Sequence, residues 1–158
     1  MVGSPRPYLT DTSFFSRYMN NQNFRIFVIA SLLFAASSCS FTKGKSLAES
    51  AVAQFHNQYN SGQFHEIYVQ ADEGFRKSSN EASLVEYLEA MRRKLGTVKQ
   101  ANQTGWHVNA TPAGTMVTLG YDVEFSHGKG TEQFVFRVTG DKALLYSFNV
   151  NSPLLITR

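Results

Sequence analysis

Hydrophobic and polar residues change their spacing near residue 97, and this change divides the chain into two kinds of secondary structure. Between residues 46 and 95, apolar residues recur every three or four positions, which is typical of amphipathic helices. From residue 97 onward, apolar and polar residues alternate, which is typical of strands with one buried face. The pattern therefore predicts helices followed by strands, an order typical of α+β proteins.

Three helices are expected before residue 97. Ser46 and Glu49 form a capping box at the start of the first helix, and Gly62 suits the left-handed conformation that ends it. A short helix is expected over residues 63–71, and a longer one ends at Gly96. Their apolar faces are formed by Leu47, Val52, Phe55 and Tyr59 in the first helix, Phe64, Ile67 and Tyr68 in the second, and Leu84, Tyr87, Leu88, Met91 and Leu95 in the third.

Two short segments are expected to lie outside regular structure. Residues 72–74 contain a glycine and break the second helix, after which Phe75 is expected to pack back onto the core. Residues 153–158 follow the last strand, begin with a proline and are expected to form a tail.

Four strands joined by short turns are expected after residue 97, and short turns make neighbouring strands antiparallel. The predicted fold class is α+β, with three N-terminal helices packed on one face of a four-stranded curved antiparallel sheet. A curved sheet wrapped around a long helix forms a cone with an opening. The residues expected to face inward are Trp106, Val108 and Ala110 in the first strand, Val117, Leu119, Tyr121, Val123 and Phe125 in the second, Phe134, Phe136 and Val138 in the third, and Leu144, Tyr146, Phe148 and Val150 in the fourth.

A separate pattern precedes the domain. Residues 26–36 form an apolar run that follows Arg25 and a polar stretch. Its length falls within the roughly 7–15 residues of a signal-peptide core and below the roughly 20 residues that span a bilayer. A signal peptide over residues 19–38, starting at Met19, is therefore expected, and residues 1–18 are interpreted as a mis-called extension. A permanent transmembrane helix and a buried core helix are the alternatives.

The signal ends at the chain's single cysteine. Ala36-Ser37-Ser38-Cys39 resembles the lipobox of bacterial lipoproteins, although leucine is usual where Ala36 stands. The resemblance implies lipidation of Cys39 with palmitate-type acyl chains, followed by a short tether over residues 39–45. In Gram-negative sorting, Ser40 implies an outer-membrane anchor that faces the periplasm. A chance cysteine beside an ordinary cleavage site is the alternative, but a lone thiol has no partner for an internal disulfide.

The net charge of the domain limits which kinds of partner it is expected to bind. Residues 39–158 carry twelve basic and eleven acidic residues, so the domain is close to neutral once the basic leader is removed. The longest basic run is Arg92-Arg93-Lys94, whose bases suit the end of a helix. Nucleic-acid binding is not expected, because it requires a basic patch or stripe.

The order of elements resembles a known superfamily. A helix like residues 48–55, a second around residues 62–68, a third ending at residues 92–96 and four antiparallel strands are similar to the cystatin-like, nuclear transport factor 2-like superfamily. The likeness is to its small exported bacterial branch of uncharacterised proteins. The resemblance covers residues 46–152 and implies the fold, which hosts enzymes, binders and structural modules alike.

Catalysis is not expected from these residues. Enzymes of this fold place an acid or base and a tyrosine in the mouth of the cone, for which the candidates are Tyr59, His107, Tyr121 and Asp122. Tyr121 and Asp122 are neighbours on a strand and point to opposite faces. No catalytic residue is therefore assigned, and an isomerase-type or hydrolase-type enzyme in the cone is the less favoured alternative.

Neither a metal site nor a cofactor is expected. The four histidines, His56, His65, His107 and His127, lack the HxxxH or HExxH spacing of zinc sites, and no second cysteine is available. No phosphate-binding glycine loop occurs, since the glycines at 128 and 130 lack the flanking residues of such a loop.

Two functions are compatible with this pattern. The first is a lipid-anchored envelope protein whose cone binds a small apolar ligand or a protein partner. The second is a module that forms a homodimer through the open sheet face, with Thr118, Val135, Leu145 and Ser147 in the contact and Asn149 toward its edge. The residues expected to line the pocket are Tyr59, Trp106, Tyr121, Phe125, Phe134 and Tyr146.

Overall fold

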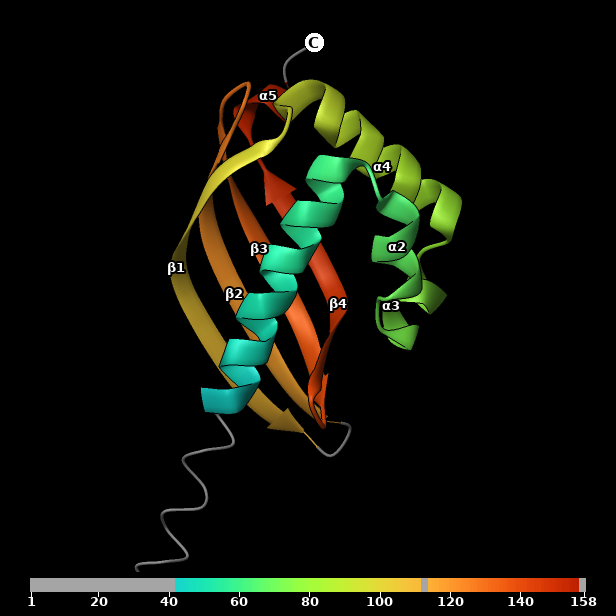
Figure 1. The fold of residues 1–158 in the computed structure, drawn as a ribbon, viewed down its shortest axis with the longest axis vertical. Helices are drawn as coiled ribbons and strands as arrows, with labels where there is room; N and C mark the ends of the chain where they lie inside the picture. The colour runs from blue at the N-terminus through green and yellow to red at the C-terminus, as the bar shows by residue number, and fades with distance from the viewer. Residues whose placement is uncertain (1–41, 112–113, 157–158) are drawn as a thin grey trace, which may run out of the picture. The chain divides into compact units, whose positions relative to one another are not determined.

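The computed structural model describes residues 42–111 and 114–156, and there the fold is α+β as predicted. A four-stranded antiparallel sheet has the strand order β1-β2-β3-β4 (Figure 1). The extension over residues 1–18, the signal over 19–38 and the lipidation site at Cys39 lie outside the described residues. The strands are β1 (Val98–Thr111), β2 (Gly114–Phe125), β3 (Lys129–Thr139) and β4 (Lys142–Asn151).

The first helix runs over residues 42–61 of the described chain. It ends as predicted at Gly62, where φ is +73°, with the N–H of Gly62 donating to Tyr59 O and the N–H of Gln63 donating to Gln58 O. The predicted N-cap at Ser46 is wrong. Residues 42–45, expected in a tether, are already helical, and Ser46 O accepts a hydrogen bond from Ser50 Oγ inside the helix.

Three more helices follow, one of which was not predicted. They are α2 (Phe64–Val69), α3 (Glu73–Ser78) and α4 (Glu81–Leu95). The expected break at residues 72–74 is the start of α3, because Asp72 Oδ1 accepts the N–H of Gly74 at 2.7 Å and caps a new helix. Phe75 packs against the core from α3, as expected.

The longest of these three helices, α4, agrees with its pattern. Asn80 Oδ1 caps it by accepting the N–H of Ser83 at 2.9 Å. The predicted apolar face is buried except at Tyr87, which is 42% exposed. The buried residues of α4 are Leu84, Leu88, Met91 and Leu95.

The predicted tail begins with a helix, α5 (Pro153–Ile156). Proline suits the first helical position, and Ser152 precedes it as a buried cap. Ser152 Oγ donates to Lys129 O at 2.8 Å and accepts the N–H of Leu154. This one-turn helix was missed because four residues give no readable period.

The inner face of the sheet follows the predicted alternation in β2 and β3. Every inward position expected on β2 is buried, whereas Asp122 and Glu124 are exposed on the other face. The first helix lies across this inner face (Figure 1), and Phe55 packs its ring against Phe134 at 5.1 Å and Phe148 at 4.8 Å between centroids. The core therefore sits between the first helix and the sheet.

The last strand breaks the alternation. The pairing with β3 shifts in register between Val135 and Phe136, which leaves Tyr146 as an extra residue on β4. Leu145 is therefore buried and Tyr146 is 39% exposed, the reverse of the prediction. The N–H of Asp72 donates to Leu145 O at 2.9 Å, so the junction of α2 and α3 covers the edge of β4 instead of the face of the sheet.

None of the helices within residues 42–111 and 114–156 combines the length and apolar character needed to cross a membrane.

Candidate functional site

A histidine and a glutamate meet in the interior between the first helix and the sheet. His56 Nε2 lies 2.7 Å from Oε2 of Glu132. The side chain of His56 is 11% exposed and that of Glu132 is fully buried. Buried titratable groups are costly unless they are paired, so this contact is a specific polar site in an apolar core.

The local sequence explains why the side chains of His56 and Glu132 both point into the interior. His56 follows Phe55, whose ring enters the core, so its side chain is turned by about 100° around the helix axis toward the flank. Glu132 precedes Phe134 by two positions on β3, which puts both on the inner face. On the neighbouring strands, Glu132 stands opposite Tyr121 and Val150.

One oxygen of this pair is unsatisfied. Oε1 of Glu132 is buried and has no hydrogen-bond partner among the described residues, whereas Oε2 faces His56. Leaving a buried acceptor without a partner costs about 1–3 kcal/mol, and more for a charged group. Such atoms are few in folded proteins, and each needs an explanation such as a bound water, an ion or a functional role.

Aromatic rings surround the imidazole. The ring centroids of Phe134, Phe55 and Tyr121 lie 5.7, 6.1 and 6.4 Å from that of His56, all in edge-on arrangements. The ring of Phe134 also packs edge-on against Tyr121 at 6.1 Å. These rings hold His56 in one orientation and give the site apolar walls.

The pKa values of three nearby tyrosines are raised by burial and by the negative charge of Glu132. Burial, followed by the charges of Glu49 and Glu132, raises the pKa of Tyr121 to about 12. Burial and then Glu132 raise the pKa of Tyr59 and Tyr87 as well. All three hydroxyls therefore remain protonated, hydrogen-bond-donating groups at neutral pH.

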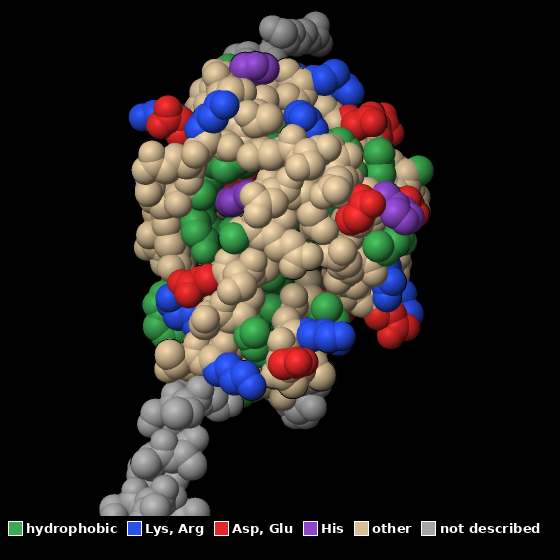
Figure 2. Space-filling view, viewed as in Figure 1, with side chains coloured by type: hydrophobic (Ala, Val, Ile, Leu, Met, Phe, Trp, Pro, Cys, Tyr) green, Lys and Arg blue, Asp and Glu red, His purple; other side chains and the backbone are tan. Residues whose placement is uncertain are grey.

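The pair lies beside an opening between the first helix and β1. At one end, the side-chain amide of Asn60 closes it by donating to Val98 O at 2.9 Å and accepting the N–H of Val98 at 2.8 Å. At the other end, Lys45 Nζ lies 5.7 Å from the ring centroid of Trp106. Figure 2 shows a hollow in this region, walled by hydrophobic side chains and with a histidine side chain inside.

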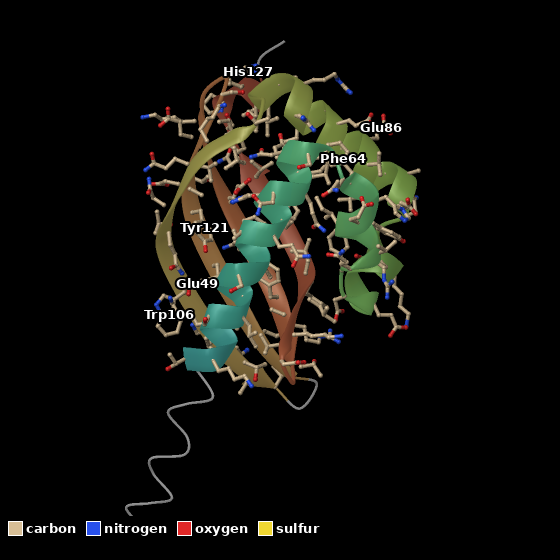
Figure 3. All side chains as sticks on the ribbon, in the orientation of Figure 1. Glu49, Phe64, Glu86, Trp106, Tyr121 and His127 are labelled. Carbon is tan, nitrogen blue, oxygen red and sulfur yellow. The ribbon has the colours of Figure 1, made fainter. Side chains whose placement is uncertain are left out.

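The middle of β1 leaves this opening uncovered. The register with β2 shifts between Gln103 and Gly105, and both residues are exposed. Gln103 stands opposite Tyr121, so their side chains share the inner face. Figure 3 shows Glu49, Tyr121 and Trp106 along the same side of the first helix. The name β1 groove is used below for the space bounded by Glu49, His56, Gln103, Trp106 and Tyr121. Glu132, which contacts His56, is itself fully buried.

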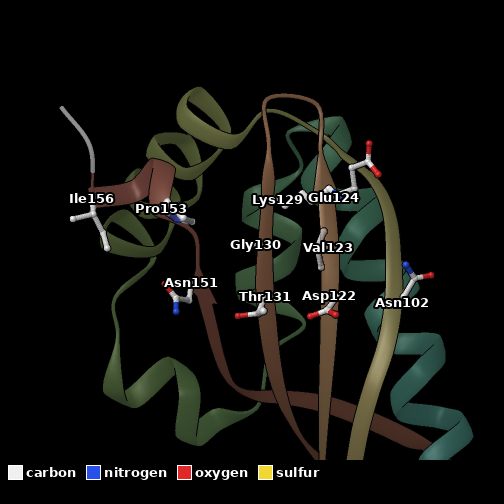
Figure 4. Close-up of a pocket in the computed structure, with 10 residues that line it drawn as sticks. All are labelled: Asn102, Asp122, Val123, Glu124, Lys129, Gly130, Thr131, Asn151, Pro153 and Ile156. Atoms are coloured by element: carbon white, nitrogen blue, oxygen red, sulfur yellow. The ribbon is translucent and has the colours of Figure 1, made fainter.

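A second hollow lies on the outer face of the sheet (Figure 4). It has a volume of about 680 Å³ and is open to solvent. The acidic side chains of Asp122 and Glu124 in it are exposed, and such side chains are solvated without a ligand. The outer hollow is lined by Asn102, Asp122, Val123, Glu124, Lys129, Gly130, Thr131, Asn151, Pro153 and Ile156.

The six residues expected to line a pocket are not brought together. Tyr121 and Phe134 contact the ring of His56, and Trp106, which is 56% exposed, stands at the rim of the β1 groove. Tyr59 is buried and donates from its hydroxyl to Gly96 O at 2.9 Å. The remaining two, Phe125 in the core and Tyr146 at the edge of β4, lie elsewhere.

Tyr146 belongs to a different cluster at the edge of β4. The guanidinium carbon of Arg137 lies 4.9 Å from the Tyr146 ring centroid, and Arg137 Nε lies 3.6 Å from Asp72 Oδ2. Since Asp72 also caps α3, this cluster ties a helix to the sheet edge. Like Oε1 of Glu132, Arg137 Nε is buried and makes no hydrogen bond among the described residues, so its contact with Asp72 is an ion pair without a hydrogen bond.

The candidates for catalysis and metal binding remain scattered. His107 and Asp122 lie on the outer face of the sheet, opposite Thr118 and Asn102, away from Tyr121. His65 pairs with Glu81 at 2.6 Å in an exposed contact, and that contact raises the pKa of His65. Within the described ranges, no three metal-ligating side chains of the histidine, cysteine or acidic type converge.

These features describe a small α+β protein in which a histidine–glutamate pair is buried between the first helix and the sheet. The chain belongs to a family of unknown function, DUF4019, whose profile matches residues 51–145. The match includes both His56 and Glu132, as well as Trp106. The curated proteins contain no match to this chain.

Proposed function

We propose that this domain is a non-catalytic binding module of the cell envelope. Its site is the β1 groove, and its ligand is a small molecule with an apolar body and one hydrogen-bond donor. The observation that carries the proposal is the buried, unpartnered Oε1 of Glu132 beside the groove. A donor from the ligand would satisfy this oxygen, and the aromatic walls would contact the apolar body.

The resemblance to the cystatin-like, nuclear transport factor 2-like superfamily supports the same site. A helix lies across the inner face of the four-stranded sheet, as a cone would require, and the β1 groove would be the mouth of such a cone. Fold-level analogy places a site without naming a ligand. The donor requirement comes from Glu132 alone.

Binding of small aromatic probes to the full chain tests the proposal. Benzyl alcohol carries a donor and toluene does not, so chemical-shift changes at groove residues should be larger with benzyl alcohol. Glu132→Gln keeps an acceptor for His56 but removes the carboxylate, and it should weaken benzyl alcohol binding. Glu124→Gln changes an exposed glutamate on the outer face and serves as the matched control. Equal shifts for both probes, or shifts confined to the outer hollow, would contradict the proposal.

Attachment to the envelope through Cys39 is the second part of the proposal. The apolar run over residues 26–36, the small residues before Cys39 and the lone thiol support a signal peptide and an N-terminal lipid. In a Gram-negative cell, the domain would be anchored to the outer membrane and would face the periplasm. The intact mass of the protein extracted from membranes should correspond to a chain that starts at Cys39 with acyl chains. A free thiol, or a chain that starts earlier, would contradict it.

Acid–base catalysis is a second candidate, favoured by one observation. The contact of 2.7 Å between His56 Nε2 and Glu132 is the arrangement that orients a general base and leaves Nδ1 for a substrate. Any probe that binds the groove can be followed by NMR for chemical change. Turnover that His56→Gln abolishes while binding persists would establish an enzyme, and an unchanged probe would support the binding module.

Association through the outer face of the sheet is a further candidate. Thr118 and Val135 are half-buried there and Ser147 is exposed, but Leu145 faces the core and contributes nothing to such a contact. Sedimentation of the delipidated protein should show a dimer that Val135→Lys dissociates. A monomer at tens of micromolar would remove this candidate.

A further inference from the structure

The outer hollow contains a row of aligned polar residues that crosses the whole sheet. On neighbouring strands, Asn102 stands opposite Asp122. Asp122 in turn stands opposite Thr131, and Thr131 stands opposite Asn151. All four are exposed and line the outer hollow (Figure 4). The name polar row is used below for these four residues, which span three strand spacings, or about 14 Å.

A further hollow continues the polar surface next to the row. It has a volume of about 380 Å³ and shares Thr131 with the outer hollow. Gly120 also lines it, and a Cβ at Gly120 would come within 3.3 Å of Thr104 Oγ1. A glycine inside a strand is typical of places where a ligand or another backbone approaches closely. The missing side chain therefore leaves depth beside the polar row.

The short helix α5 gives the outer hollow an apolar wall. Ile156 is 81% exposed and lines the hollow together with Pro153. The helix is held against α4, since Lys94 Nζ donates a hydrogen bond to Leu155 O at 3.1 Å. The outer hollow therefore combines a preformed apolar wall with a row of hydrogen-bonding side chains.

The charges of the outer hollow indicate which ligands fit it. Asp122 and Glu124 are acidic, whereas Lys129 is its one basic residue and stands opposite Glu124. The Asp122 carboxylate would repel a phosphate or another anion. Within the described ranges, no three metal-ligating side chains converge. The rest of the polar row offers uncharged amide and hydroxyl groups, which both donate and accept hydrogen bonds.

We propose that the outer hollow binds a neutral saccharide that lies along the polar row. Sugar hydroxyls donate and accept, so neighbouring hydroxyls would pair with the Asp122 carboxylate and with the amides of Asn102 and Asn151. Asn102 Oδ1 already accepts from Gln100 Nε2 at 3.1 Å, which leaves the Asn102 amide N–H groups as donors. The apolar C–H face of a sugar ring would pack against Ile156.

This site is independent of the β1 groove. Asp122 follows Tyr121 on β2, so their side chains point to opposite faces of the sheet. The two sites also differ in chemistry, because aromatic rings wall the β1 groove and short polar side chains line the outer hollow. A saccharide at the polar row therefore adds a second binding activity to the proposed apolar one.

Binding of two trisaccharides to the full chain tests the inference by NMR. Cellotriose is an extended ribbon with hydroxyl groups along both edges, and maltotriose is curved. At millimolar concentrations, at least one of them should shift the amide signals of the polar row and leave that of His56 unchanged. Added salt should not change the affinity, because the ligand is uncharged.

Substitutions along the polar row should weaken this binding. Asp122→Ala removes a charged acceptor inside the row and should raise the Kd about tenfold or more. Asn102→Ala should raise it less, since it removes an uncharged donor. Asn109→Ala is the matched control, because Asn109 is an exposed asparagine on the same strand outside the outer hollow. This control should bind the trisaccharide as the parent does.

The other outcomes overturn the inference. These are an absence of shifts with both trisaccharides, shifts confined to the β1 groove, or equal losses in Asn102→Ala and Asn109→Ala. Spermidine represents a competing, cationic occupant. If spermidine shifts the polar row and neither trisaccharide does, the carboxylates form a cation site instead. Failure of benzyl alcohol to bind the β1 groove leaves this inference intact, because the two kinds of probe report on opposite faces of the sheet.

Discussion

At the scale of single residues, the contact between His56 and Glu132 is difficult to explain by stability. Burying two titratable groups costs desolvation, and well-packed apolar residues of similar volume are often neutral or stabilising by about 1–4 kcal/mol in their place. One oxygen of Glu132 gains no hydrogen bond in return. A costly polar pair inside an aromatic cluster is therefore consistent with a role in binding.

This reasoning predicts opposite effects on stability and on function. The double variant His56→Phe with Glu132→Leu should unfold in urea at an equal or higher free energy than the parent, because no charge is then left buried. The same variant should no longer bind benzyl alcohol. Glu132→Leu alone should lose about 3–5 kcal/mol, since it leaves His56 buried without its partner. A double variant that is less stable than either single variant would show that the pair is structural.

The sequence contained a signal for this site that remained unused. Glu132 has the inward parity of Phe134 and Phe136, and an acidic residue at an inward strand position requires a partner. The partner could not be named, because His56 is 76 residues away and only the packing of the first helix brings the two together. Tyr121 and Phe134 were found because apolar alternation is readable within one strand.

At the scale of elements, periodicity predicted the long elements and failed on the short ones. The first helix, α4 and β2 have many turns or alternations, and their buried faces were predicted almost completely. The four-residue α5 and the six-residue α3 depend on the caps at Ser152 and Asp72, which resemble ordinary turn residues in sequence. The extra residue at Tyr146 reversed the predicted parity in the first part of β4, whereas Phe148 and Val150 face the core as predicted. A periodic pattern does not show where a bulge occurs.

The connection between α4 and β1 gives a prediction at this scale. Gly96 has a φ of +78°, and a Cβ there would meet Ser126 Oγ at 1.9 Å. Rotating that hydroxyl away would break its hydrogen bond from the N–H of Thr97. Gly96→Ala should therefore cost more than the roughly 1–3 kcal/mol of an unfavourable backbone conformation alone.

Gly140→Ala is the matched control for that clash. Gly140 also has a positive φ, +64°, but a Cβ there would meet no atom within 4 Å. Its substitution should cost only the conformational part, measured as the difference in urea midpoint. Equal losses at Gly96 and Gly140 would show that Ser126 yields without penalty. Partial recovery in Gly96→Ala with Ser126→Gly would confirm the clash.

At the scale of the whole molecule, the first helix, the sheet and α4 share one core, and buried tyrosines link its stability to pH. Tyr121 stays protonated in the folded state up to a pKa of about 12, whereas an unfolded tyrosine ionises near pH 10. Above about pH 10 the unfolded chain therefore releases a proton that the folded chain keeps. The contribution of the neutral phenol is fully present below about pH 10 and is lost as the pH rises toward about 12.

Urea unfolding at increasing alkaline pH should therefore show a falling free energy, with one step contributed by Tyr121. Tyr121→Phe removes this group without removing its ring from the aromatic cluster, so the free energy of unfolding should fall less steeply above pH 10. Tyr146→Phe changes an exposed phenol at the sheet edge and should leave the slope as in the parent. Lysine deprotonation affects all three proteins alike, so the difference in slope isolates Tyr121. Parallel curves for the parent and Tyr121→Phe would mean that this phenol ionises as easily in the fold as outside it, and that burial and the charges of Glu49 and Glu132 do not raise its pKa.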